Sequence, residues 1–314
     1  MKKLTLTAAL LCGLSGFAHA ADWTESPWGP DDEIGAANRI TPESVKAAAQ
    51  LVTEGKTYNL GIIIDSTTPA FAPRSMSLTV LQPNQIESEG LGHNHMTYND
   101  DIFMGWLGIG PQIDGLGHIG VGHTYYNGFK DSDFAKADGL KKLGLEKLPP
   151  IITRGVMIDM AKFYGEPILK EGTAYTKEDI MAAAKQQGVE IREGDTVLFH
   201  SGWLNLLDGD NPDHARYVST EPGLGITGAE YLAEIGVVAV GGDTWGLEAV
   251  PFEEGDNGIF KVHQILIPQN GIYILENMDT RELAADGVHE FMFSLGVTRI
   301  RGAVQMMINP TAIR

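Results

Sequence analysis

The sequence predicts an α/β fold with a mixed β-sheet at its core and helices flanking the sheet. Short apolar segments alternate with helical segments through the middle of the chain, whereas both ends are rich in strands. Several of the middle strands are apolar throughout, which is typical of strands buried on both faces. No low-complexity linker and no repeat of fixed period divides the 314 residues, so we expect one domain over residues 21–314.

The first elements follow an irregular segment, Trp23 to Pro42, that is rich in Trp, Pro, Asp and Asn. A helix is predicted from Thr41-Pro42-Glu43 to Val52, because Thr is a favourable N-cap and Pro fits the first helical position. Two segments rich in β-branched and aliphatic residues then predict strands, at Thr57 to Ile64 and at Ser77 to Leu81.

The middle of the chain continues the alternation. Ile151 to Met160 predicts a buried strand, and Thr176 to Gln187 predicts a helix that starts with a capping box. Three short buried strands are expected further on, at Thr196 to Phe199, Val237 to Val240 and Ile272 to Leu275. A helix is expected at Thr227 to Ile235, between the first two of these strands.

The first twenty residues are typical of a secretion signal. Lys2 and Lys3 precede an apolar stretch, and Ala18-His19-Ala20 forms a small-x-small cleavage site. Cys12 follows Leu11 instead of a small residue, which favours cleavage after Ala20 over lipidation. No later segment has 18 uninterrupted apolar residues. We therefore expect a periplasmic or secreted protein without membrane contact once residues 1–20 are removed.

The composition restricts the chemistry. Loss of the signal takes the net charge from −18 to −20 and removes the only cysteine. Disulfides and thiolate ligands are thereby excluded, leaving His, carboxylate, amide and water as metal ligands. Strong acidity argues against nucleic acid and anionic membranes, because both require a basic surface. A small molecule is the expected partner.

The segment from Gln112 to His118 carries an amide, a carboxylate and an imidazole within seven residues. In an extended segment Gln112 and Asp114 project to the same side, and the glycines that follow allow a turn that brings His118 back toward them. Oxygen and nitrogen donors that converge in this way suit a divalent cation. The alternative is that Asp114 and His118 serve only a turn, as an Asx-turn residue and a backbone-bonded histidine.

Two later residues are candidate partners. Glu276 ends an apolar strand, where a carboxylate must be paired, protonated or bound to a cation. His263 precedes another apolar segment, and both side chains could reach the cavity of Asp114 and His118; Glu276 could also be a solvent-exposed acid at a strand end. His93 and His95 would share one face of a strand, but their glycine-rich surroundings fit a mobile loop equally well.

Several stretches resemble the cyclase family of metal-dependent hydrolases, which includes bacterial kynurenine formamidase, isatin hydrolase and a dienelactone hydrolase. The resemblance implies the swivelling β/β/α fold of that family. It extends from residue 28 to about residue 310, in these segments: Trp28 to Gly35, Gln112 to Ile119, Tyr126 to Gly128, Arg154 to Val156, Gly194 to Leu198, Pro222 to Gly225, Gly242 to Trp245, His263, and Leu275 to Asn277.

The resemblance also implies roles for individual residues. The metal-binding carboxylate falls on Asp114, the proton-transferring histidine on His118, and the later metal-binding His and Glu on His263 and Glu276. The first two histidines of the family pattern fall on Gly108 and Gln112. This sequence therefore lacks two of the histidines that a two-metal site of the family uses. We expect one Zn or Mn ion held by the Asp, the later His and the Glu. Gln112 is a candidate fourth ligand, and His95 could supply the donor missing at residue 108.

The resemblance implies a metal-dependent hydrolase that cleaves an aryl formamide, a cyclic amide or a lactone with metal-activated water. His118 would take a proton from the water and pass it to the leaving group. The two missing histidines motivate a second hypothesis, an exported small-molecule binding protein on the same scaffold without catalysis. Because similar proteins self-associate, we also expect a homo-oligomer.

Overall fold

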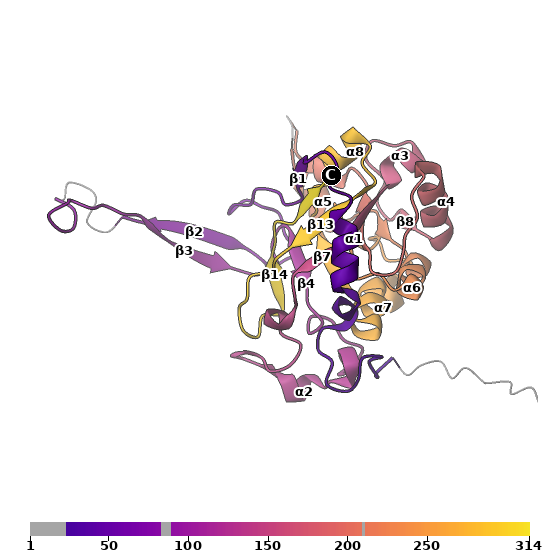
Figure 1. Cartoon of the computed structure of the whole chain (residues 1–314), viewed down its shortest axis with the longest axis horizontal. Coiled ribbons are helices and arrows are strands. Elements are labelled where there is room, and N and C mark those ends of the chain that lie inside the picture. Colours follow the sequence, from indigo (N-terminus) through magenta and orange to yellow (C-terminus); the bar gives the residue numbers. More distant parts are fainter. Residues whose placement is uncertain (1–22, 83–88, 209–210) are drawn as a thin grey trace, which may run out of the picture.

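The structure is a computed structural model that describes residues 23–82, 89–208 and 211–314. Its centre is a nine-stranded mixed sheet with the strand order β1-β15-β13-β7-β9-β11-β12-β4-β14 (Figure 1). The predicted signal peptide lies outside the described residues. The sheet strands are β1 (Thr57–Asn59), β4 (Gln112–Asp114), β7 (Ile151–Asp159), β9 (Thr196–His200), β11 (Ala239–Gly242), β12 (Tyr273–Glu276), β13 (Glu290–Leu295), β14 (Gln305–Met307) and β15 (Thr311–Ile313).

The middle of the sheet is parallel and buried. β7, β9, β11 and β12 run parallel, while β13 and β15 on one side and β4 and β14 on the other pair antiparallel. Every residue of β9, β11 and β12 is buried, as their apolar sequences predict. The α/β fold with a mixed sheet is therefore confirmed.

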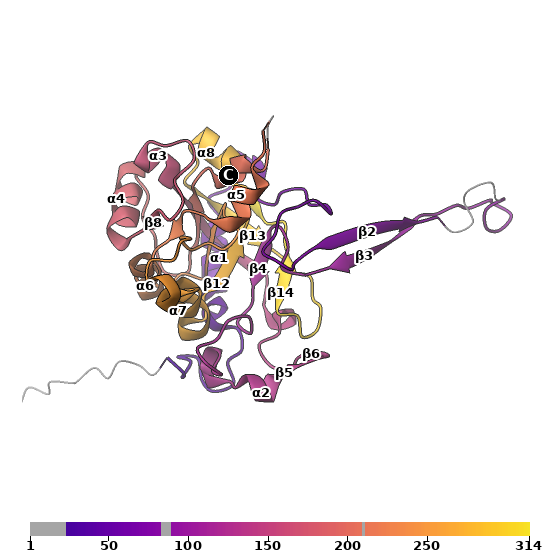
Figure 2. The same cartoon turned by 180° about the vertical axis from the view of Figure 1, so that it is seen from behind.

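Four longer helices pack around this sheet. α1 (Pro42–Ala49) packs on β7 and β13, and α4 (Lys177–Gln187), α6 (Ile226–Ile235) and α7 (Lys261–Asn270) lie side by side (Figure 2). The predicted capping box at α4 is present, because Thr176 accepts from the Asp179 amide and Asp179 accepts in return. α1 ends three residues before the predicted Val52.

Further short α-helices and strands surround the sheet: α2 (Asp131–Phe134), α3 (Met160–Tyr164), α5 (His214–Ser219), α8 (Arg281–Asp286), β5 (Ala135–Lys136), β6 (Gly139–Leu140), β8 (Ala174–Tyr175) and β10 (Gly223–Leu224). No helix among the described residues has the length and hydrophobicity needed to cross a membrane.

The predicted strand Thr57 to Ile64 is much shorter than expected. β1 ends at Asn59, because the Leu60 amide donates to the carbonyl of Pro310 and proline has no N–H to continue the ladder. The chain then leaves the sheet, and Ile63 is 97% exposed. The segment after β1 therefore leads outward instead of extending the core.

A long hairpin projects from the body of the molecule (Figures 1 and 2). It is formed by β2 (Met76–Leu81) and β3 (Asp100–Gly105), which pair antiparallel, with Met76 opposite Gly105 at the base and Leu81 opposite Asp100 further out. We call residues 76–105 the arm; the structure describes 76–82 and 89–105 of it. The predicted strand Ser77 to Leu81 is confirmed, but it lies outside the core, and nearly all its residues are exposed.

Candidate metal centre

The pairing of β4 with β12 brings three polar side chains to one face of the sheet. Gln112 lies opposite Glu276, and Asp114 lies opposite Ile274. Residues two apart on a strand share a face, so the Gln112 and Asp114 side chains lie together, with Gln112 Nε2 3.3 Å from Asp114 Oδ1. Asp114 and Glu276 are both buried, and Asp114 lies within a strand. The turn and surface alternatives for these two acids therefore do not hold.

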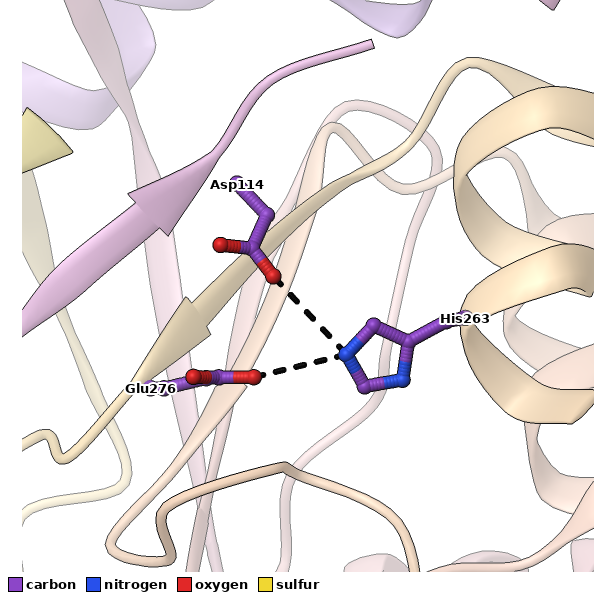
Figure 3. A group of neighbouring side chains, drawn as sticks. All are labelled: Asp114, His263 and Glu276. Atoms are coloured by element: carbon purple, nitrogen blue, oxygen red, sulfur yellow. Dashed lines mark hydrogen bonds and ion pairs between the residues drawn. The ribbon is translucent and has the colours of Figure 1, made fainter. Parts of the chain in front are cut away.

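Helix α7 supplies the third member of the cluster. His263 lies in the first turn of α7, directly after Phe260, Lys261 and Val262, and its ring points between the two carboxylates (Figure 3). Its Nε2 lies 3.3 Å from Glu276 Oε1 and 3.7 Å from Asp114 Oδ2. One ligand atom from each of the three residues lies within 4.8 Å of the others. We call Asp114, His263 and Glu276 the triad.

The geometry of the triad fits a divalent cation. Zinc bonds to N and O ligands of about 2.1 Å place tetrahedral ligand atoms about 3.4 Å apart, close to the distances from His263 Nε2. Oδ2 of Asp114 is buried and accepts no hydrogen bond from any residue that the structure describes. A buried carboxylate oxygen without a donor is costly unless a cation meets it. One imidazole and two carboxylates suit Zn or Mn.

Glu248 orients the imidazole from behind. Its Oε1 lies 2.7 Å from His263 Nδ1, so Nδ1 donates to Glu248 and Nε2 faces the other two members of the triad. The same carboxylate accepts from the backbone amides of Val262 and His263, two of the donors that the first turn of α7 leaves unsatisfied. Glu248 therefore fixes both the start of the helix and the ring that the helix carries.

Two members of the triad, His263 and Glu276, have raised pKa values when no cation is present. Burial alone lowers the pKa of His263, but the hydrogen bonds to Glu248 and Glu276 outweigh it and raise that pKa to about 10. Burial, together with the nearby charge of Asp114, raises the pKa of Glu276 to about 7. A metal ligand must be deprotonated, so a cation competes with protons at this position.

Gln112 lies beside the triad but not in the expected orientation. Its Nε2 donates to Glu276 Oε2 at 2.6 Å, while its Oε1 faces Arg74 Nη1 at 3.5 Å. An amide nitrogen is a donor and offers no lone pair to a cation. In this arrangement Gln112 therefore holds the carboxylates in place, which differs from the expected fourth ligand.

His118 closes one side of the site. Its amide donates to the Gly115 carbonyl, which is the predicted turn after β4, and its Nε2 lies 3.8 Å from Asp114 Oδ2. Burial lowers the pKa of His118, so the ring is neutral near pH 7. The ring lines a cavity of about 170 Å³ beside the triad, together with Phe71, Arg74, Ile119, Trp245, Phe260, His263 and Glu276.

Gln305, on β14, is a site residue that the sequence analysis missed. Its Nε2 donates to Asp114 Oδ1 at 2.7 Å and lies 3.4 Å from His118 Nε2. A Cβ built on Gly108 would lie 2.5 Å from Gln305 Oε1. Gln305 thus fills the space beside the position where the resemblance places a histidine. Glu248 was also missed, because neither residue stands in a recognisable motif and both reach the site through long-range packing.

His93 and His95 lie in the arm and not at the metal centre. Both fall between β2 and β3, beyond the last β2–β3 pair, Leu81 and Asp100, and both are exposed. The Nδ1 atom of His95 contacts the Glu89 carbonyl oxygen at 2.8 Å. Within this chain, His95 therefore does not supply the donor missing at Gly108, and it does not line the cavity.

Comparisons with known proteins identify the family. A family model described as "Putative cyclase" matches residues 58–249, which is more than half of the chain. The chain belongs to the cyclase family. A crystal structure of a novel cyclase is 31% identical, with a TM-score of 0.83 over 91% of this chain and 98% of that chain. This agreement confirms the predicted cyclase-family fold.

Two more distant cyclase-like structures share the fold. An isatin hydrolase bound to the product analogue thioisatinate is 16% identical, with a TM-score of 0.60 over 87% of this chain and 98% of that chain. A predicted metal-dependent hydrolase from Bacillus stearothermophilus is 17% identical, with a TM-score of 0.52 over 83% of this chain and 98% of that chain. No curated protein matches this cyclase.

Proposed function

We propose that this cyclase is a metal-dependent hydrolase that opens a cyclic amide or a lactone, or cleaves an aryl formamide. The observation that carries the proposal is the triad, in which the buried Oδ2 of Asp114 has no described hydrogen-bond donor and faces His263 Nε2 at 3.7 Å. Likeness in fold to an isatin hydrolase and to a predicted metal-dependent hydrolase supports the same class of reaction.

Each side chain has a defined task in this proposal. Asp114, His263 and Glu276 would hold the ion, which supplies a Lewis acid that makes water nucleophilic near neutral pH. His118 is neutral and lines the cavity, so it can accept the proton of the attacking water and return it to the leaving nitrogen or oxygen. Gln112 and Gln305 keep the carboxylates in position by donating to them.

Metal analysis combined with a substrate panel tests this proposal. The purified chain is expected to carry one equivalent of Zn or Mn and to hydrolyse at least one compound among lactones, cyclic amides and aryl formamides. Chelation should abolish turnover, and either ion should restore it. Small-molecule binding that survives chelation, without turnover of any compound in the panel, would instead support the exported binding protein.

We also propose that the protein is exported and that residues 1–20 are removed. The support is the order of two lysines, an apolar stretch and Ala18-His19-Ala20 in the sequence. Amino-terminal sequencing of the protein from the periplasm or culture medium should start at Ala21. A start at Met1 in the cytoplasm would reject the proposal.

Self-association through the arm is a further part of the proposal. The arm exposes apolar side chains on both of its faces: Leu78, Val80 and Phe103 on one, and Ile102 and Met104 on the other. A projecting two-stranded sheet with this much exposed apolar surface is unfavourable in water and typical of an interaction site. A second copy of the chain is the partner that we propose.

A further inference from the structure

Arg74 brings a positive charge to the wall of the metal cavity. It lies just before β2, is half-buried, and donates through Nη1 to the Gly108 carbonyl oxygen at 2.8 Å. Its second contact is the longer one with Gln112 Oε1, at 3.5 Å. The remaining guanidinium donors have no hydrogen-bond partner among the described residues.

The charge of Arg74 is not balanced by a direct ion pair. No carboxylate of the described residues lies within 4.0 Å of its guanidinium, whereas Arg154 and Arg281 each contact two carboxylates. Asp114 and Glu276 together would balance a divalent ion in the triad. The third carboxylate of the site, Glu248, lies behind His263 and is held by amides of α7. With the triad loaded, Arg74 is the positive group left facing the cavity.

The walls beside Arg74 are flat and aromatic. Phe71, one turn before Arg74, stacks on Trp245 with ring centroids 5.4 Å apart and an interplanar angle of 16°. Phe260 packs against Phe71 in a T-shaped arrangement, with ring centroids 6.2 Å apart. Aromatic faces favour flat ligands, and a cavity of about 170 Å³ restricts them to small ones.

We propose that Arg74 binds an anionic group, most simply a carboxylate, on a small flat substrate whose scissile carbonyl lies at the triad. The inference rests on the proposed function and narrows it to anionic lactones, cyclic amides or aryl formamides. The guanidinium donors that are free of Gly108 can make charge-assisted, paired hydrogen bonds to a carboxylate. Arg74 would thus be a specificity-determining residue that holds the substrate while His118 and the triad act on its carbonyl.

The competing interpretation is structural. Arg74 could serve only to hold the Gly108 carbonyl and the start of the arm, in which case its replacement would weaken all ligands alike. A pair of ligands with the same shape and different charge separates the two interpretations. Benzoate and benzamide form such a pair, and neither has a bond that the enzyme is expected to hydrolyse quickly.

The decisive experiment is calorimetric titration of both probes into the zinc-loaded protein, after metal content has been measured. The wild type should bind benzoate roughly tenfold to a hundredfold more tightly than benzamide. Arg74→Met should abolish this preference, and Arg74→Lys should keep part of it. Arg192→Met is the matched control, because Arg192 is exposed, pairs with Glu190 and does not line the cavity; its preference should equal that of the wild type.

Two results would overturn the inference. A wild type without preference for benzoate would show that the cavity does not select anions. An Arg74→Met protein that retains the preference would show that the carboxylate binds the metal instead of Arg74.

A kinetic comparison gives a second readout. 2-Formamidobenzoate is anionic and formanilide is neutral. Arg74→Met should lower the kcat/KM for 2-formamidobenzoate relative to that for formanilide, mainly by raising KM for the anionic compound. Absence of bound metal, or of turnover with every compound, would refute the proposed hydrolase. The preference for benzoate over benzamide would still test the role of Arg74 separately, because that measurement does not depend on turnover.

Discussion

Glu248 Oε1 lies 2.7 Å from His263 Nδ1, on the side of the imidazole opposite Asp114 and Glu276. This single contact selects the ring nitrogen that faces the site and also satisfies amides at the start of α7. A carboxylate of this kind raises the basicity of a metal-binding histidine and restricts its orientation.

Replacing Glu248 should therefore weaken metal binding. Glu248→Gln keeps an oxygen for Nδ1 but removes the charge, so zinc affinity should fall roughly tenfold to a hundredfold in competition with a chelator. Glu253→Gln is the control, because Glu253 accepts from the first amide of α6 and not from the site. Equal zinc affinity in both variants would contradict the role given to Glu248.

Replacing Asp114 should stabilise the metal-free protein and abolish its activity. Its unpartnered buried oxygen and its proximity to Glu276 disfavour the metal-free fold, so Asp114→Asn should melt about 2 °C or more above the wild type when metal is absent. The same variant should bind no zinc and be inactive. Asp131→Asn, at a partly exposed acid that pairs with His123 away from the site, provides the comparison. A lower melting temperature for metal-free Asp114→Asn would argue against a site built for a cation.

Metal binding should strengthen as the pH rises. The raised pKa values of Glu276, about 7, and His263, about 10, mean that the metal-free fold holds protons that the unfolded chain releases earlier. Their stabilising effect is complete at low pH, and it is lost as the pH rises through those values. A cation requires both groups deprotonated, so the increase in Tm caused by zinc should be larger at about pH 8 than at about pH 6. A zinc-induced increase in Tm that does not depend on pH would exclude these two residues as ligands.

Replacing His118 should lower the rate of turnover and leave metal binding unchanged. Loss of a proton-transferring group costs roughly 10²–10⁴-fold in rate, so His118→Gln should lose that much kcat and keep its metal content. His123→Gln changes an exposed imidazole five residues further on and should behave as the wild type. Metal loss in His118→Gln would make this residue a ligand instead of an acid–base group.

The arm should determine the oligomeric state. Glutamate at Leu78, Val80 and Phe103, which share one face of the arm, should convert a self-associated protein into a monomer in light-scattering measurements. Val52→Glu introduces a charge at an exposed apolar residue outside the arm and should leave the mass unchanged. A wild-type protein that is monomeric throughout would reject the proposed self-association.

The sequence predicts features that depend on neighbouring residues. The alternation along a strand placed Gln112 beside Asp114, and the end of an apolar strand pointed to Glu276 as a buried acid. The sequence does not predict the strand order, because β4 lies between β12 and β14, which are distant along the chain. Gln305 and Glu248 reach the site only through that arrangement, so no local pattern reveals them.

The arm also escaped prediction in part. Ser77 to Leu81 has the residues of a core strand, yet its exposed position depends on where the chain leaves the sheet after Asn59. β3 begins with Asp100 and Asp101 and lacks a clear apolar period, so it was not expected to pair with β2. Strand formation follows from composition, whereas burial follows from topology.

The close fit between Gly108 and Gln305 constrains the evolution of this site. A histidine at residue 108 would force the Gln305 amide to move, because its Cβ would lie 2.5 Å from Gln305 Oε1. A shorter side chain at residue 305 alone would remove the donor to Asp114 and gain no ligand in exchange. Residues 108 and 305 are therefore coupled, because a larger side chain at residue 108 displaces the amide that holds Asp114.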